Sequence, residues 1–313
     1  MDYSIYYKSK VPETGTIGGG WDIFVSAYNL SHRVRSVFSR VQSQRKVWVV
    51  HGEYGFSENE LPKMGESFEY SGSDESGFCV ELLEQLNVDE GWPGRICVDV
   101  TGILRPHMMC FVAKLESLGV RTVDVLYTEP RSYTRRESTE FSKGKISSIR
   151  QVAGLEGIAN TVLGNDLLVV GAGYDHRLIT EVAHHKEAAQ KVSILGFPPL
   201  RADMYQQNLL RAHQAEGALG PLTQSTRFFA PANDPFVTAS VVKDIVQSRE
   251  SEVSNLYLCP LATKPQALGF VLYFVAEGRH RNCSVIFPFS EGYEKETSKG
   301  VARTWHYVLE FAG

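Results

Sequence analysis

Two pairs of basic residues stand where the sequence predicts that helices begin, directly after buried strands. His32 and Arg33 follow one apolar run, and His176 and Arg177 follow another. The N-terminus of a helix carries about half a positive charge, so an adjacent cation is unfavourable by about a few tenths of a kcal/mol unless an anion is near. We therefore expect a ligand phosphate, a ligand carboxylate or an aspartate beside these residues.

Each of these residues has a structural alternative to ligand contact. The arginines either bind a ligand or form ion pairs with nearby carboxylates, which are Asp22, Asp166 and Asp175. The histidines either contact the ligand or pack at an interface between domains. If the protein is an enzyme, His176 is a candidate general base, because an imidazole changes its charge near neutral pH. Asp175 is itself a candidate ligand contact beside Arg177.

A second pair of basic residues follows the third predicted strand of each half. Arg105 and Lys264 are each followed by a proline, and proline is favoured in the first turn of a helix. Thr101 and Thr263 precede them, and each either bonds to a ligand or caps the following helix. We include all four residues in the predicted ligand site.

Acidic and aromatic candidates end the neighbouring strands. Asp99, in the segment CVDVTG, is either a carboxylate tuned for general-base catalysis or one that bonds to loop amides. Arg131 and Tyr133 follow the fourth strand of the first half and are candidate ligand contacts. Tyr127, Tyr133 and Tyr293 either stack on a nucleobase or pack as core and rim residues.

These candidates lie on strands and helices that alternate along the chain. Short apolar runs such as KVWVV, RICVDV and NLYLCPL alternate with segments whose apolar residues have helical spacing. Such alternation predicts parallel sheets with right-handed crossovers. The predicted fold class is α/β, with two tandem Rossmann-like units and mainly parallel sheets. Ligands of such sheets bind at the carboxyl ends of the strands, where all the candidates stand.

The two halves of the chain resemble each other, which predicts an internal duplication. Setting Asp22 on Asp166 aligns the two His-Arg pairs without a gap. Further along, Arg105 and its proline align with Lys264 and its proline, and a tyrosine follows in each half. The spacing between matched residues grows slowly in one direction, as it does when small insertions follow a duplication.

The repeat also predicts how the chain divides. We expect a first Rossmann-like half at residues 1–145 and a second at 146–313, either separate or packed as one pseudo-symmetric unit. A polar segment at about 135–160 links them, as a plain linker or through a helix. The second half has an additional helix at 200–217, and the final run TWHYVLEF predicts a strand that joins an existing sheet.

Composition and missing motifs exclude several functions. The chain has 32 Lys and Arg against 36 Asp and Glu, so we expect no strong binding to duplex nucleic acid. The five cysteines form no CxxC pair, which argues against a zinc site or a disulfide framework. No GxxxxGK[ST] is present, and VGAGYD lacks the third glycine of GxGxxG. We expect neither a metal nor a cofactor.

The sequence also predicts the compartment. The first residues, MDYSIYYKSK, lack the apolar core of a signal peptide. No apolar run approaches the roughly 18 residues that a membrane span requires. We therefore expect a cytoplasmic protein that does not enter a membrane.

The segments DVTGILRPHMMCF and LATKPQALGFVLYF each contain a strand end, a threonine, a basic residue and a proline that opens a helix. They resemble CARF domains, the CRISPR-associated Rossmann-fold sensors, and the resemblance covers both halves loosely. The residues that carry it are Thr101, Arg105 and Pro106 in the first half and Thr263, Lys264 and Pro265 in the second.

The resemblance implies recognition of a nucleotide or oligonucleotide signal at the strand ends, in a bacterial antiviral defence system and often across a dimer axis. CARF sensors normally carry an appended effector or winged-helix domain, for which we expect no room after Gly313. The implied partner is therefore a separate effector protein or a second copy of the chain, unless the internal duplication replaces the dimer.

Two functions from different classes remain open. In the first, the protein is a non-catalytic nucleotide-sensing or complex-forming subunit that clamps phosphates with Arg33, Arg105, Arg177 and Lys264. In the second, it is an enzyme that hydrolyses or transfers a group on a nucleotide or phosphosugar. Asp99 or His176 would then act as general base, and Arg105 or Lys264 would stabilise the developing negative charge. A purely structural partner would bind no ligand at all.

Overall fold

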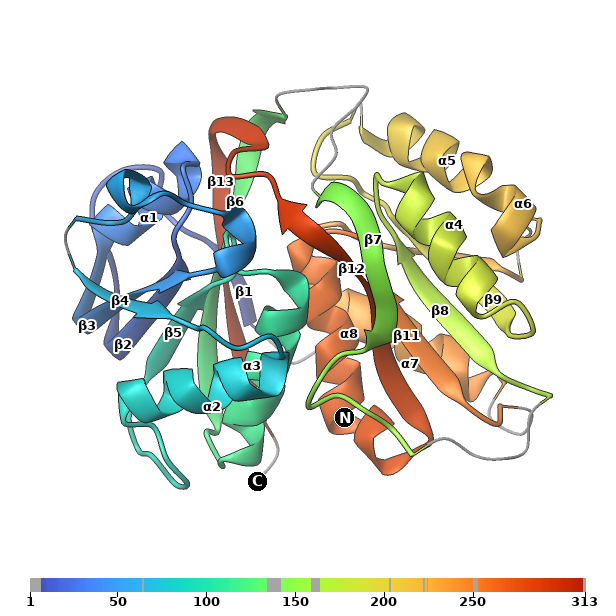
Figure 1. Cartoon of the computed structure of the whole chain (residues 1–313), viewed down its shortest axis with the longest axis horizontal. Coiled ribbons are helices and arrows are strands. Elements are labelled where there is room, and N and C mark those ends of the chain that lie inside the picture. Colours follow the sequence, from blue (N-terminus) through green and yellow to red (C-terminus); the bar gives the residue numbers. More distant parts are fainter. Residues whose placement is uncertain are drawn as a thin grey trace. The chain divides into compact units, whose positions relative to one another are not determined.

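A computed structural model describes residues 7–63, 65–133, 142–158, 164–202, 204–221, 223, 225–249 and 253–311. The chain divides into two compact units (Figure 1). The first unit comprises residues 6–144 and 291–313, and the second unit comprises residues 145–290. Each unit contains one sheet with helices packed on it.

The first unit contains a seven-stranded sheet with the order β1-β13-β6-β5-β2-β3-β4. Its strands are β1 (Tyr7–Lys10), β2 (Ile17–Ala27), β3 (Val41–Val50), β4 (Glu66–Glu69), β5 (Ile96–Asp99), β6 (Thr122–Tyr133) and β13 (Ser298–Glu310). Its helices are α1 (His32–Arg40), α2 (Glu75–Leu86) and α3 (Arg105–Ser117), with single 3-10 turns η2 (Gly52–Tyr54) and η3 (Glu58–Glu60). The strands from β4 to β6 are parallel, whereas β13 and β1 are antiparallel to their neighbours.

The second unit contains a six-stranded sheet with the order β10-β9-β8-β11-β12-β7. Its strands are β7 (Ser142–Gln151), β8 (Leu167–Ala172), β9 (Gln190–Gly196), β10 (Arg227–Ala230), β11 (Leu256–Pro260) and β12 (Cys283–Tyr293). Its helices are α4 (His176–His185), α5 (Met204–Gln214), α6 (Glu216–Leu219), α7 (Pro235–Gln247) and α8 (Lys264–Ala276), with a 3-10 turn η4 (Gly278–His280). The strands from β10 to β12 are parallel.

The two sheets share one arrangement of five strands, β4-β3-β2-β5-β6 in the first unit and β10-β9-β8-β11-β12 in the second. In each, the chain starts at the centre, moves outward to one edge, and then returns to build the other side. A topological switch point therefore lies between β2 and β5, and another between β8 and β11. The predicted fold class, two Rossmann-like units with mainly parallel sheets, is confirmed, and the shared strand order is what a duplication predicts.

The chain passes from one sheet to the other twice. After β6 it enters the second sheet as β7, and after β12 it returns to the first sheet as β13. The red strand β13 lies beside the green strand β6 in Figure 1, paired from Ser298 opposite Tyr133 to Glu310 opposite Thr122. Residues 291–313 therefore belong to the first unit, although the repeat placed them in the second half. Within its described residues, 142–158, the predicted linker contributes a strand, β7, and no helix.

Apolar spacing explains why these helices pack where they do. Helix α1 buries Val34 and Val37, one turn apart, and Val37 packs in a cluster that includes Phe24, Cys97 and Leu126 from three adjacent strands. Burying such side chains stabilises the unit by roughly 1.5–3 kcal/mol each. All five cysteines are buried and free, as expected for core residues. The additional helix predicted at 200–217 is present as α5 at Met204–Gln214.

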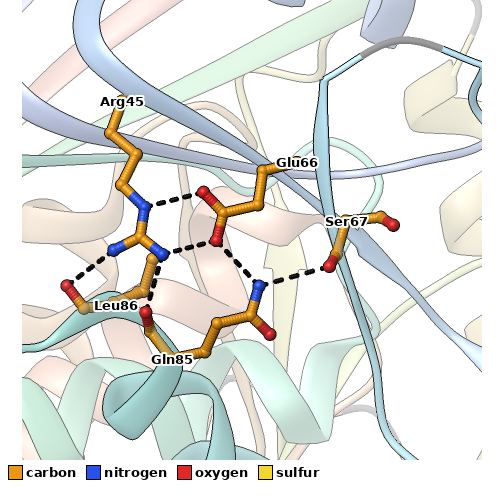
Figure 2. A network of polar contacts seen from close by, with 5 residues as sticks. All are labelled: Arg45, Glu66, Ser67, Gln85 and Leu86. Carbon is orange, nitrogen blue, oxygen red and sulfur yellow. Dashed lines mark hydrogen bonds and ion pairs between the residues drawn. The ribbon is translucent and has the colours of Figure 1, made fainter.

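A charged network fastens the outer strand β4 of the first unit (Figure 2). The Arg45 guanidinium pairs with the Glu66 carboxylate, with Nε 2.7 Å from Oε2. It also donates to the carbonyl oxygens of Gln85 (2.6 Å) and Leu86 (2.9 Å) at the end of α2. The Gln85 amide donates to Glu66 (2.8 Å) and to the Ser67 carbonyl (3.2 Å). One cation therefore neutralises a carboxylate and bonds the last carbonyls of a helix.

We expect Arg45→Met to destabilise the protein by about 1–2 kcal/mol, because two helix carbonyls and one carboxylate lose their donor in a partly exposed site. Arg45 lowers the pKa of Glu66, so this stabilisation is present above the ordinary glutamate pKa and is lost as pH falls through the lowered value. Denaturant unfolding of both proteins across acidic pH would measure it. As a control, Lys10→Met removes only the exposed Lys10–Glu13 pair and should change stability by less than about 0.5 kcal/mol.

Candidate functional site

A buried polar pair marks the switch point of the first unit. Ser26 on β2 and Asp99 on β5 are directly opposite each other in the parallel ladder, one residue from the carboxyl end of β2 and at the end of β5. Both side chains are completely buried. The Ser26 hydroxyl donates to Asp99 Oδ2 at 2.9 Å, and the Thr101 amide donates to Oδ1 at 3.0 Å. The carboxylate thus holds the loop that leaves β5.

The second unit has no such pair at the equivalent positions. There, Val170 on β8 is opposite Cys259 on β11, in the ladder that corresponds to β2 and β5. Both residues are buried. The same strand order thus forms with apolar side chains, so the fold itself does not require a carboxylate at Asp99. Burying a carboxylate is costly unless it is bonded, which suggests that Asp99 has a local task.

Opposing effects act on the pKa of Asp99. Burial raises its pKa, while hydrogen bonds from Thr101 and Ser26 and the nearby Arg33 charge oppose the rise. The sequence left open whether this carboxylate is a catalytic base or a partner of loop amides. The structure shows the second arrangement, because Thr101 donates its amide and Asp99 has no exposed surface.

Arg33 in α1 and Thr101 in the loop after β5 both form hydrogen bonds with β6. The Thr101 hydroxyl oxygen accepts from the Thr128 amide at 2.9 Å, and Arg33 Nη1 donates to the Thr128 carbonyl at 2.7 Å. Thr101 therefore does not cap α3, one of the two roles predicted for it. Asp22, a predicted ion-pair partner of the arginines, lies within β2 and accepts from the Arg95 amide at 2.7 Å and from the Gln44 amide at 2.7 Å. Arg33 Nε is buried and makes no hydrogen bond within the described part of the chain.

The helices that begin at the two switch points differ in their caps. In the first unit, Ser31 before α1 and Leu104 before α3 make no side-chain cap hydrogen bond. In the second unit, Asp175 accepts from the first amides of α4, and Thr263 accepts from the Gln266 amide in α8. A helix N-terminus without a side-chain cap satisfies its amide groups with water or a ligand, and anions are favoured there.

Arg105, the first residue of α3, is half-buried among tyrosines. Burial lowers its pKa, and the phenol groups of Tyr293, Tyr127, Tyr133 and Tyr54 oppose that shift. Burial also raises the pKa of Tyr54 to about 12 and raises those of Tyr127 and Tyr293. The predicted residues Arg105 and Tyr133 are therefore neighbours.

Arg33 and Arg105 both affect the pKa of the same two tyrosines. Each lowers the otherwise raised pKa of Tyr54 and of Tyr127. The Tyr54 hydroxyl donates to the Gly102 carbonyl at 2.8 Å, which places it beside the loop between β5 and α3. Gly102 is required there, because a Cβ would lie 2.4 Å from the Ala27 carbonyl oxygen. We call Arg33, Arg105 and the four tyrosines the arginine–tyrosine site.

The remaining residues predicted for the first half lie outside this set. His32 is exposed at the start of α1, and Arg131 is exposed on β6. Three contributing residues were not predicted from the sequence: Tyr54, which belongs to the site, Thr128, which bonds to Arg33, and Ser26, which bonds to Asp99. A serine within an apolar strand, opposite the equally unusual Asp99, was the only available signal for Ser26.

The residues predicted for the second half are used within the second unit. The side chain of Arg177 is exposed and pairs with Asp175 at 3.5 Å, which is one of the alternatives that the sequence left open. His176 Nδ1 lies 3.4 Å from Arg211 Nη1 on α5. Asp166 accepts from Asn255 at 2.8 Å at the start of the sheet.

Thr263 and Lys264 open helix α8. Thr263 donates its hydroxyl to the Ala232 carbonyl at 2.5 Å and caps the helix, the capping role that the sequence predicts. Lys264 is half-buried as the first helical residue. The additional helix α5 contributes Asn208, whose buried amide donates to the Ala172 carbonyl (3.1 Å) and accepts from the Gly196 amide (3.3 Å). The ends of β8 and β9 are thereby bonded internally.

Two further findings concern metals and membranes. Within the described ranges, no group of three or more His, Cys, Asp and Glu side chains could hold a metal ion. No helix in the same ranges has both the length and the apolar character needed to cross a bilayer.

No family model and no curated protein matches this chain. Among solved structures it is similar to CobK precorrin-6A reductase, at 12% identity and a TM-score of 0.26, covering 86% of this chain and 88% of that one. It is also similar to a structure of the adenylation, ketoreductase and pseudo Asub domains of a keto acid-selecting NRPS module, at 11% identity and a TM-score of 0.24. That match covers 88% of this chain and 30% of the other. Likenesses this distant carry no argument about the site.

We expect Asp99→Ala to destabilise the protein by about 2–4 kcal/mol, because the buried Ser26 hydroxyl and Thr101 amide lose their acceptor. Asp99→Asn keeps one acceptor and can donate to Ser26, so it should cost less than half as much. Urea unfolding of the two variants and the wild type would measure these differences.

The same variants test the charge of Asp99. Its pKa is raised in the folded state, so its contribution to stability is present below the ordinary aspartate value of 3.8 and is lost as pH rises through the raised value. The wild type should therefore lose stability over that range relative to Asp99→Asn. Parallel pH profiles would contradict a buried, titrating Asp99.

Proposed function

We propose that the protein is a non-catalytic nucleotide-sensing or complex-forming subunit, and that the first unit binds a phosphate-bearing ligand at the arginine–tyrosine site. The observation that carries this proposal is the difference between two switch points with the same strand order. In the first unit both helix starts lack side-chain caps and carry Arg33 and Arg105. In the second unit the equivalent helix starts are capped by Asp175 and Thr263.

The chemistry of the site supports a nucleotide in particular. Two guanidinium groups beside two helix N-termini can bind a phosphate through charge-assisted hydrogen bonds. The half-buried rings of Tyr133 and Tyr293 can stack on a base, and a phenol tolerates any base because each has a π face. Negative groups also face the site: Glu53 acts on Tyr54 and Tyr293, and Glu129 acts on Tyr127. These acids disfavour ligands with more negative charge than the two arginines can offset.

The enzyme alternative receives less support from the same geometry. A general base must come within hydrogen-bond reach of the proton that it removes, and Asp99 is completely enclosed. His176, the other candidate base, lies in the second unit beside Arg211. The proposed setting, bacterial antiviral defence with a separate effector protein or a second copy as partner, rests on the CARF-like sequence segments.

Native mass spectrometry of protein purified gently from its own cells would test the proposal. We expect a small molecule that is retained in the native spectrum and released unchanged on denaturation. Arg33→Met and Arg105→Met should each weaken rebinding of the released compound by about 10- to 100-fold, because each removes one charge-assisted contact. Arg177→Met, at the equivalent helix start of the second unit, should leave affinity unchanged. A spectrum of protein alone, or equal losses in all three variants, would contradict the proposal.

A further inference from the structure

Two segments that carry residues of the arginine–tyrosine site are joined by one lysine. Lys295 Nζ lies 2.7 Å from Glu60 Oε2 and 5.1 Å from the centre of the Phe56 ring. Glu60 and Phe56 belong to the segment of residues 52–61, which follows β3 and contains η2 and η3. Lys295 belongs to the turn between β12 and β13. Both segments are parts of the first unit.

Each segment contributes directly to the site. Tyr54 lies within the first segment, two residues before Phe56, and bonds to the loop that leads to Arg105. Tyr293 lies two residues before Lys295, and it opposes the effect of burial on the Arg105 pKa. A movement that separates the two segments can therefore move Tyr54 or Tyr293 away from Arg105.

The acceptor of Lys295 is held in place before the lysine binds. Glu60 Oε2 also accepts from the Ser57 amide (2.9 Å) and the Ser57 hydroxyl (3.0 Å), which forms the capping box of η3. These donors, with Lys295 the strongest, lower the pKa of Glu60 to about 2. The carboxylate is therefore charged at any physiological pH, and protonation does not open the contact.

The Phe56 ring beside Lys295 is itself held by contacts with two other aromatic rings. The Phe56 ring contacts the Tyr54 ring at 5.7 Å and the Tyr28 ring at 5.3 Å between centres. Lys295 and Glu60 nevertheless keep 23% and 34% of their side-chain surface exposed. Water can compete for an ion pair of this exposure, so it can break without unfolding the unit.

We propose that Lys295 is a latch that closes segment 52–61 over the arginine–tyrosine site and thereby controls access to Arg105. This inference rests on the proposed function, because closing segment 52–61 over the site serves a purpose only if a ligand binds there. The latch itself is a property of the ligand-free protein. Binding would require the Lys295–Glu60 contact to open and would allow it to close again over the ligand.

Two measurements without any ligand test the latch in the full chain. In Lys295→Met, amide hydrogen exchange in segment 52–61 should become at least about threefold faster, because local opening no longer breaks an ion pair. Phenylglyoxal, an arginine reagent, should label Arg105 faster by a similar factor, as mapped by peptide mass spectrometry. Lys295→Arg should restore both rates, and Lys299→Met, an exposed lysine on β13, should leave both unchanged.

The outcomes separate the latch from the proposed function. Unchanged exchange in segment 52–61, or unchanged labelling of Arg105, would overturn the latch even if the native spectrum shows a ligand. Faster exchange and labelling together with an empty native spectrum would support the latch and contradict the nucleotide proposal. Equal effects of Lys299→Met would show a general loosening of the turn and would also overturn the latch.

Discussion

The first unit depends on how one buried carboxylate is satisfied. Asp99 lies at the switch point between β2 and β5 and has no exposed surface, and a buried carboxylate requires donors from the protein. Ser26 supplies one donor from the neighbouring strand and Thr101 supplies another from the following loop. That loop in turn bonds to Thr128 on β6, which also receives Arg33. The chain of bonds fixes two helix starts relative to three strands, as preorganised binding requires.

The second unit provides an internal comparison, because it builds the same strand order without that carboxylate. Its helix starts are satisfied by Asp175 and Thr263, and its strand ends by Asn208. Backbone groups that are already hydrogen-bonded to these side chains are less able to bind a ligand. The two copies of one architecture have thus diverged: the second unit caps these two helix starts with side chains, and the first unit begins the equivalent helices without side-chain caps, beside Arg33 and Arg105. Fold and site are separable here, as they are in Rossmann-like proteins generally.

Much of the fold could be predicted from the sequence because buried parallel strands are short apolar runs and the repeat doubled the evidence for them. The exchange of β7 and β13 could not, because nothing in a terminal strand such as TWHYVLEF shows which of the two sheets it joins. At the site, Arg33, Thr101, Arg105 and Asp99 were predictable from the rule that ligands collect at strand ends. Tyr54 and Ser26 were not, because no motif marks a tyrosine in a loop or a serine within a strand. The candidates of the second half have the same residue types as those of the first. Their different role becomes visible only in the structure, where side chains cap the helix starts of the second unit.

The pairing of β13 with β6 has a consequence for folding during synthesis. Residues 298–310 cover the edge of β6, whose partner on that side is otherwise missing. While the ribosome makes the intervening residues of the second unit, β6 must remain an open edge that could pair with other chains. The first unit thus begins to fold first yet is completed last. A chain that stalls between β12 and β13 would already contain every residue of the arginine–tyrosine site but would lack the strand that protects its sheet.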